Sequence, residues 1–173
     1  MATPVRPLPP ISPLVRAALR VADLGRSRAF YAALGFSEIH FEGPLDAAVV
    51  PALLGVDPSA RTRCVILKTP GQPNFGTVGL FEVDEPLPVA RPGGSGGWQV
   101  GEAMLVFYVA DMEATLTATL MHGGTRVSGP LHLRMPHGSQ PEALLRDPDG
   151  VLINLVARPP VESFGFESLH PTR

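Results

Sequence analysis

The segment Arg16-Ala-Ala-Leu-Arg-Val-Ala-Asp23 recurs in the second half of the chain as Met104-Leu-Val-Phe-Tyr-Val-Ala-Asp111. In both copies a short apolar strand pattern precedes an Asp that can cap a helix. A glycine follows each Asp after the same interval, at Gly35 and at Gly123, where a left-handed residue would end that helix. The sequence therefore predicts two copies of one structural unit, with a binding site in the cleft between them.

The chain of 173 residues is predicted to form one domain built from two modules of the same design. Each module has the pattern of a strand, a helix and three further strands. The predicted fold class is therefore α+β, with two tandem βαβββ modules that form a cupped, partly open barrel. A helical insert is expected at residues 45–56. The predicted boundaries are an extended tail at 1–13, modules at 14–86 and 102–157 within a single domain at 14–157, a glycine-rich linker at 91–101, and a C-terminal tail at 158–173.

The composition argues against several classes of function. The formal net charge is only −2 and the charges are mixed along the chain, so there is no basic stripe for a nucleic acid. The longest apolar stretch, residues 47–56, contains Pro51 and is only about 10 residues long. A stretch of this length is too short to span a bilayer. The proline-rich start lacks the apolar segment of a secretory signal, and the single cysteine, Cys64, is typical of a reducing compartment. We therefore expect a cytoplasmic protein that binds neither nucleic acid nor membrane.

Alternate side chains of each predicted strand should point to opposite faces of the sheet. One face packs against the helix of the module, and the other lines the cup. The alternation assigns Leu19 and Phe107 to the packed face, and Phe81 and Val83 with them. The side chains assigned to the cup are Arg16, Ala18 and Arg20 in the first strand, Leu80 and Glu82 in the strand at 78–83, Met104, Val106 and Tyr108 in the repeated strand, and Leu152, Asn154 and Val156 in the last strand.

Across residues 14–157 the chain resembles the vicinal oxygen chelate superfamily, which includes glyoxalase I, bleomycin-resistance proteins, extradiol dioxygenases and methylmalonyl-CoA epimerase. The resemblance implies a glyoxalase-like fold and, because proteins of this superfamily are commonly dimers, a homodimer. The motifs that carry it are Val21-Ala-Asp-Leu24 with Phe30-Tyr31 and Leu34-Gly-Phe36, then Phe107-Tyr-Val-Ala-Asp111, then Asp147-Pro-Asp-Gly-Val151.

The resemblance also implies where a metal would bind, and the residues at those positions are unsuitable. Members with a metal place His, Gln or Glu at positions that map onto Arg16, Glu82, Met104 and Asn154. Only Glu82 matches, because arginine has no lone pair to offer, a thioether is a soft ligand and Asn154 offers a neutral amide. We therefore predict no metal and no cofactor, with Arg16 paired to Glu82 as a built-in cation. The alternative is that this pair only closes a site that has been filled in.

The predicted cup suits a small-molecule ligand. Arg16, Arg20, Tyr108 and Asn154 would supply polar contacts above apolar residues that include Met104. This combination favours a small apolar or aromatic acid, bound without a metal. Two alternatives remain open: a metal-dependent lyase, isomerase or ring-cleaving dioxygenase with an unusual ligand set around Glu82, and a dimeric structural module with an empty cup.

The sequence leaves open whether any reaction occurs. The candidates for catalysis are His132, His137 and Tyr108. The two histidines have an interval of five residues, which matches no single strand face, so they would meet only through a bend. Three roles stay open for them: a place on the rim of the cup, contact with a ligand as a general base, and metal ligation.

Overall fold

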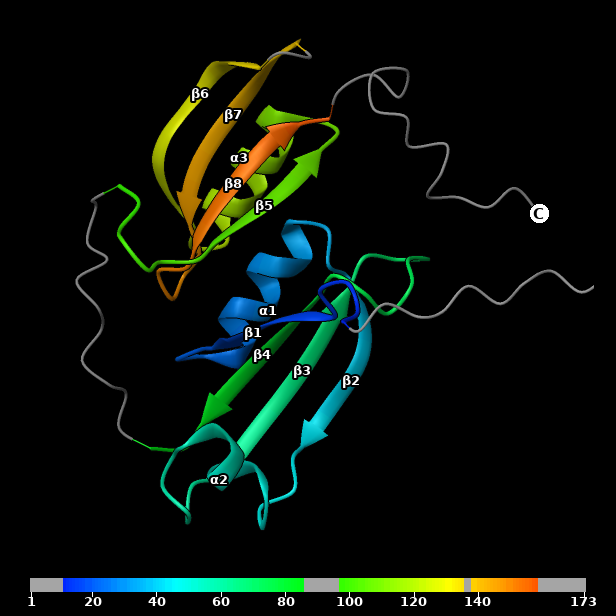
Figure 1. Ribbon diagram of the computed structural model, residues 1–173, viewed down its shortest axis with the longest axis vertical. Helices are drawn as coiled ribbons and strands as arrows, with labels where there is room; N and C mark the ends of the chain where they lie inside the picture. Colours follow the sequence, from blue (N-terminus) through cyan, green and yellow to red (C-terminus); the bar gives the residue numbers. More distant parts are fainter. Residues whose placement is uncertain (1–10, 86–96, 136–137, 159–173) are drawn as a thin grey trace, which may run out of the picture. The chain divides into compact units, whose positions relative to one another are not determined.

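The computed structural model describes residues 11–85, 97–135 and 138–158 (Figure 1). Its contacts divide the chain into two compact units, and α1 groups with the second unit although it follows β1 in the sequence. Most of the predicted tails, most of the predicted linker and His137 lie outside the described residues. The elements are β1 (Arg16–Arg20), α1 (Leu24–Ala33), β2 (Glu38–Pro44), α2 (Val50–Leu54), β3 (Thr62–Lys68), β4 (Thr77–Val83), β5 (Met104–Val109), α3 (Met112–Met121), β6 (Thr125–Met135), β7 (Gly138–Arg146) and β8 (Leu152–Ala157).

Each unit contains a four-stranded mixed sheet, and the two sheets have the same topology. The strand order is β1-β4-β3-β2 in the first sheet and β5-β8-β7-β6 in the second. The first strand of each module pairs in parallel with the last, and the remaining pairs are antiparallel. The α+β class and the repeated βαβββ order are confirmed, and both sheets are open at their edges. No helix within the described ranges has the length and apolar character needed to cross a bilayer.

The two predicted glycine stops are present in the structure. Gly35 and Gly123 have φ of +116° and +89°, a region that residues with a Cβ rarely adopt. At the start of α3, the carboxylate of Asp111 accepts a hydrogen bond of 2.9 Å from the backbone N–H of Ala114. This is the predicted N-cap, and it satisfies one of the backbone donors that every helix leaves open at its start.

In the second unit, α1 is fixed by buried aromatic and polar contacts. The rings of Phe30 and Tyr31 meet edge to face, with their centroids 5.2 Å apart. A Cβ on Gly124 would lie 2.8 Å from Phe30, so only glycine allows this close approach. The hydroxyl of Tyr31 donates a hydrogen bond to Asp147, and the hydroxyl of Ser27 donates another to the neighbouring Asp149. These contacts explain why α1 groups with the second unit.

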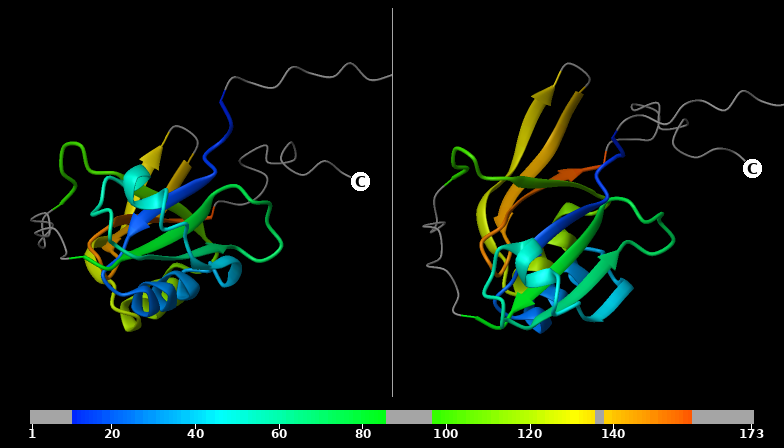
Figure 2. Two further views of the ribbon diagram at one scale, coloured as in Figure 1. Left: turned by 90° about the horizontal axis from the view of Figure 1, so that it is seen from below. Right: turned by 60° about the horizontal axis from the view of Figure 1, so that its bottom comes forward.

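The hairpin of β6 and β7 is longer than the sequence predicted. We expected the second of these strands at residues 143–146, but β7 begins at Gly138, and β8 pairs only with its last part, from Glu142 onward. Figure 2 shows the two strands continuing past β8. β6 has a bulge near Gly129, because the register shifts between Ser128 and Leu131. The extension converts a predicted loop, including Glu142, into strand.

Candidate functional site

The pairing of β1 with β4 decides which side chains share a face of the first sheet. Residues directly opposite each other point to the same side. Arg16 lies opposite Thr77, Ala18 opposite Gly79 and Arg20 opposite Phe81. We call this side the Arg16 face. The close packing confirms it, because a Cβ on Gly79 would lie 2.6 Å from Cδ of Arg16 and 2.9 Å from Cε2 of Phe81.

The predicted pair of Arg16 and Glu82 is wrong. Glu82 is an odd number of residues beyond Thr77, the partner of Arg16, so its side chain points to the other side of the sheet. There its carboxylate pairs with the guanidinium of Arg63 and accepts a hydrogen bond of 2.8 Å from the backbone N–H of Leu24. Arg63 first, and then this N–H, hold the pKa of Glu82 below its usual value.

The same error reversed the predicted sides of two neighbours in β4. Leu80 was expected in the cup, but it is fully buried opposite Leu19. Phe81 was expected on the packed face, but it lies opposite Arg20 on the Arg16 face. An assignment that is wrong by one residue transfers every side chain of a strand to the other face. The alternation within β4 was right, and its register against β1 was wrong.

The second sheet shows which residue of β4 matches Asn154. Val106 lies opposite Asn154 in β5 and β8, as Ala18 lies opposite Gly79 in β1 and β4. The counterpart of Asn154 in the first unit is therefore Gly79 and not Glu82. The four repeated positions are then Arg16, Gly79, Met104 and Asn154.

These four positions do not fit a divalent metal ion. They present a guanidinium without a lone pair, no side chain at all, a soft thioether and one neutral amide. The alkyl part of Arg16 also covers Gly79, where a ligand of the first unit would have to project. Within residues 11–85, 97–135 and 138–158, no three His, Cys, Asp or Glu side chains gather in a way that could hold an ion.

Arg20 presents an unsatisfied hydrogen-bonding edge on the Arg16 face. Its Nη1 pairs with the carboxylate of Glu85 at 2.9 Å, and the side chain is 30% exposed. Its Nε and Nη2 atoms are buried and have no hydrogen-bond partner among the described residues. These two atoms form the edge of a guanidinium that binds a carboxylate with two parallel hydrogen bonds. Leaving a buried donor unsatisfied costs about 1–3 kcal/mol, so a bound oxyanion would relieve that cost.

Arg16 lies on the same side, but it has a partner within its own sheet. Its Nε donates a long hydrogen bond of 3.4 Å to the hydroxyl of Thr77. That hydroxyl in turn donates to the backbone carbonyl of Val15 at 3.0 Å. Arg16 therefore contributes positive charge to the Arg16 face, while Arg20 contributes the two hydrogen-bond donors that have no partner among the described residues.

On the second sheet, Met104, Tyr108 and Asn154 share one side, which we call the Asn154 face. This placement agrees with the predicted side of the strand for all three. Asn154 is buried, and its Nδ2 donates a hydrogen bond of 2.7 Å to the carboxylate of Glu142. The sequence pattern had suggested only a loop charge at Glu142. A signal was present in the alternation of Glu142, Leu144 and Arg146, which would have placed Glu142 on this face.

His132 does not join the other candidates for catalysis. It lies opposite Pro141, whereas Glu142 lies opposite both Leu131 and Val156. Neighbouring residues of one strand point to opposite sides, so His132 is on the other side of the sheet from Tyr108 and Asn154. His137 lies outside the described residues. A histidine base next to Tyr108 therefore finds no support in the part of the chain that the structure describes.

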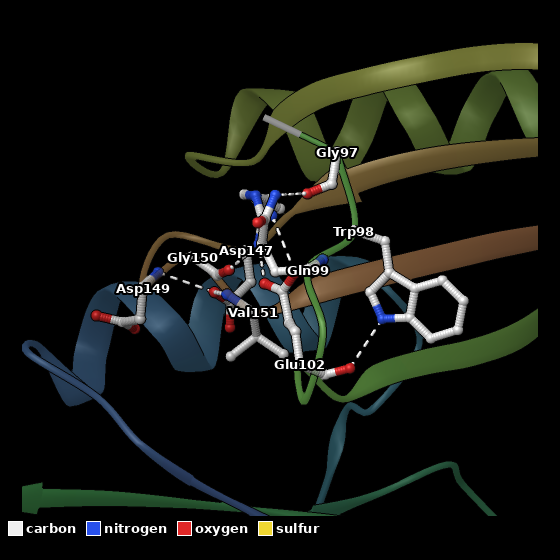
Figure 3. A network of polar contacts seen from close by, with 9 residues as sticks. Gly97, Trp98, Gln99, Glu102, Asp147, Asp149, Gly150 and Val151 are labelled. Carbon is white, nitrogen blue, oxygen red and sulfur yellow. Dashed lines mark hydrogen bonds and ion pairs between the residues drawn. The ribbon is translucent and has the colours of Figure 1, made fainter. Parts of the chain in front are cut away.

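The Asp147 turn is a structural network. The carboxylate of Asp147 accepts hydrogen bonds from the backbone N–H groups of Asp149 and Val151, at 2.9 and 2.8 Å (Figure 3). Arg146 pairs with Glu102 and donates to the carbonyl of Gly150 at 2.7 Å. Figure 3 also shows the indole of Trp98, which donates to the backbone carbonyl of Glu102 at 2.8 Å. These contacts use the polar groups to hold the backbone of the turn in place.

Comparison with known proteins identifies the fold. No protein-family model and no curated protein sequence matches the chain. A glyoxalase family protein from Bacillus cereus matches with a TM-score of 0.69 at 17% identity, over 90% of this chain and 98% of its own. A glyoxalase/dioxygenase from Nostoc punctiforme matches with a TM-score of 0.55 at 18% identity, over 91% and 100%. TnmS3, an antibiotic binding protein from a Streptomyces species, matches with a TM-score of 0.52 at 20% identity, over 88% and 100%.

These likenesses agree with the repeated strand order of the two sheets. The fold expected from the sequence motifs is confirmed, and at this level of identity the likeness extends to the fold alone. The chain has the glyoxalase-like fold that the glyoxalase, bleomycin-resistance and dioxygenase proteins share.

Proposed function

We propose that this chain is a small-molecule-binding protein that acts without a bound metal and takes a small aromatic or apolar acid on its Arg16 face. The observation that carries the proposal is that the buried Nε and Nη2 atoms of Arg20 have no hydrogen-bond partner among the described residues. A half-buried guanidinium with one side paired to Glu85 and the other side unsatisfied is suited to one more carboxylate. The fold supports the proposal, because TnmS3, which shares it, is an antibiotic binding protein.

The residues around Arg20 favour a ligand with an apolar body. Phe81 lies directly opposite Arg20 and is half-buried, so its ring can contact a ligand whose acid group meets the guanidinium. Cys64 lies opposite Phe81 on the next strand and is buried. Ala18 is exposed and lies opposite Gly79, so neither of these residues adds bulk. Such a surface, apolar with one strong anchor, is typical of a small-molecule site.

The enzyme alternative loses its main support. A lyase, isomerase or ring-cleaving dioxygenase with an unusual ligand set needed Glu82 on the Arg16 face, and Glu82 lies on the other side with Arg63 and Leu24 as partners. No observation favours a metal-dependent reaction over binding. The homodimer and the cytoplasmic location stay predictions of the sequence.

The test compares benzoate with benzyl alcohol, which has the same ring and no charge. We expect benzoate to raise the melting temperature of the protein and benzyl alcohol to do so far less, because a ligand of the folded state alone stabilises it. Arg20→Gln should weaken benzoate binding by at least about tenfold, and Arg20→Lys, which keeps the charge without the planar edge, by less. Arg61→Gln is the matched control, because Arg61 is an exposed cation of the same unit, paired with Asp84.

Two results would overturn the proposal. One is benzoate affinity that survives Arg20→Gln unchanged. The other is wild-type protein that binds neither probe at concentrations of about 10 mM, where even weak fragments of this size are detected. The second result would favour the remaining alternative, a structural module with an unused cup.

A further inference from the structure

Glu142 is a carboxylate on the Asn154 face whose position the sequence did not reveal. It lies on β7, directly opposite Val156 on one side and Leu131 on the other. The side chain of Asn154 donates a hydrogen bond of 2.7 Å to its Oε2 atom. Asn154 is itself more than nine-tenths buried, with 8% exposure, so it holds the carboxylate at a fixed place on the sheet.

Glu142 differs from two other strand carboxylates, Glu38 and Glu82, in having no cationic partner among the described residues. Glu38 pairs with Lys68 at 2.9 Å, and Glu82 pairs with Arg63. Among the described residues, no Lys, Arg or His side chain forms an ion pair with Glu142, and the amide of Asn154 is its only hydrogen-bond donor. A half-buried negative charge without a positive partner is costly, and a cation from outside the chain would relieve that cost.

The carboxylate lies in an apolar and aromatic surrounding. Tyr108, Val156, Glu142 and Leu131 form one row across the four strands of the second sheet. Tyr108 and Leu131, at the two ends of the row, are 44% and 65% exposed, and Val106 beside Tyr108 is 55% exposed. One negative charge in the middle of exposed apolar side chains suits a ligand that is apolar and carries one positive charge.

A second acceptor lies beside the carboxylate. The Oδ1 atom of Asn154 is buried and has no hydrogen-bond partner among the described residues. One N–H of its Nδ2 atom is donated to Glu142, and the Oδ1 atom can still accept a hydrogen bond from a ligand. The basic residue that the register places on this face, Arg146, pairs with Glu102, so the two acceptors favour a ligand that donates hydrogen bonds, the opposite of the donor edge that Arg20 offers in the first unit.

We propose that Glu142 anchors a subsite for an organic cation, an ammonium or amidinium group on an apolar or aromatic body. The Oε1 atom, which Asn154 does not engage, accepts a charge-assisted hydrogen bond from the cation. The ring of Tyr108 adds a cation–π or stacking contact, and Val106 and Leu131 contact the apolar body. The inference is independent of the proposed acid site, because its residues belong to the other unit and bind the opposite charge.

The experiment uses benzylamine, which is a cation near neutral pH, with benzyl alcohol as its neutral counterpart. We expect NMR titration of the full chain to show benzylamine binding at least about tenfold tighter than benzyl alcohol. Glu142→Gln keeps the shape of the side chain and should remove that preference. Glu113→Gln is the matched control, because Glu113 is an exposed acid of the same unit in the first turn of α3.

Two further measurements test the contact with the ring and the independence of the two sites. Tyr108→Leu should weaken the affinity for benzylamine by about three- to tenfold if the ring contacts the cation. This test stays valid even if the Glu142→Gln variant folds poorly. Arg20→Gln should leave the affinity for benzylamine unchanged, and Glu142→Gln should leave the affinity for benzoate unchanged. Either proposal can therefore fail without the other. The inference is overturned if benzylamine binds no better than benzyl alcohol, if Glu142→Gln keeps the preference, or if Mg²⁺ or Ca²⁺ alone displaces benzylamine at equal concentration.

Discussion

The hydroxyl of Tyr31 donates a hydrogen bond of 2.9 Å to the carboxylate of Asp147, and the two side chains come from α1 and from the turn before β8. Both residues are buried, with exposures of 0% and 3%. Burial is the main cause that raises the pKa of Tyr31, and the negative charge of Asp147 raises it further. Burial likewise raises the pKa of Asp147. The pair therefore links α1 to the second sheet through a bond that requires the phenol to keep its proton.

This pair predicts a loss of stability at alkaline pH. The phenol of an unfolded chain ionises near pH 10, while the folded Tyr31 keeps its proton, so the folded state binds more protons above that pH. The free energy of unfolding should then fall by up to about 1.4 kcal/mol for each pH unit above 10. Tyr31→Phe should remove this part of the slope and lower stability near neutral pH by about 1–2 kcal/mol, because Asp147 loses a donor.

Urea unfolding between neutral pH and about pH 11 measures both effects. Tyr108→Phe is the control, because it removes the other tyrosine of the chain, which lies on β5 and is 44% exposed. Cys64 adds a slope of the same sign, since burial raises the pKa of its thiol, so only the difference between wild type and Tyr31→Phe isolates the phenol. An equal slope in the two proteins would show that the hydrogen bond does not hold the proton.

The close packing of Arg16 over Gly79 predicts a coupled pair of substitutions. Gly79→Ala places a Cβ 2.6 Å from Cδ of Arg16, so the arginine must move, and Phe81 at 2.9 Å leaves little room. We expect a loss of about 1–3 kcal/mol in the free energy of unfolding. Adding Arg16→Ala should recover much of it, which gives a coupling free energy of about 1 kcal/mol or more in a double-mutant cycle.

Gly97→Ala is the control for this cycle, since a Cβ there meets open space. It should change stability by less than about 0.5 kcal/mol. If Gly79→Ala and Arg16→Ala are simply additive, then Arg16 does not cover Gly79 in solution, and the account of the first unit's face is wrong.

Much of the fold could be predicted because local signals repeat. The two Asp residues before the helices and the two glycines after them, Gly35 and Gly123, fixed the helices to within about two residues. The start of β7 could not be predicted, because Gly138 to Pro141 lack the apolar alternation that marks a strand. Their strand is set by pairing with β6, a contact between segments that local pattern does not contain.

The site was harder to predict because it depends on register. Alternation alone placed Met104, Tyr108 and Asn154 on one side correctly, since β5 and β8 are both regular. It failed for Glu82, because the offset between β1 and β4 depends on the loops and on α2, whose geometry the sequence does not specify. The repeat alone does not supply the register, because Gly79 is 63 residues beyond Arg16 and Asn154 is 50 residues beyond Met104, and only the observed strand pairing shows that they match.

The observed position of Glu82, on the side of the sheet opposite to Arg16, predicts a role in stability and no role in metal or ligand binding. Arg63 and the N–H of Leu24 lower its pKa, so its ionised form stabilises the folded state at any pH above the ordinary carboxyl value of about 4.3. That stabilisation is lost as the pH falls through the lowered pKa of the folded state. Glu82→Gln should therefore cost about 1 kcal/mol near neutral pH, mostly from the helix N-terminus, because Arg63 is well exposed to solvent.

Three measurements on Glu82→Gln check this assignment together. The stability difference from wild type should shrink as the pH falls below about 4.3, the benzoate affinity should stay within about twofold, and elemental analysis should find the same metal content in both proteins. Glu113→Gln controls for the loss of one negative charge. A stoichiometric Zn, Ni, Mn or Fe ion in the wild-type protein that is lost with Glu82→Gln would contradict the assignment, because a carboxylate on the side of Arg63 and Leu24 cannot reach an ion held on the Arg16 face.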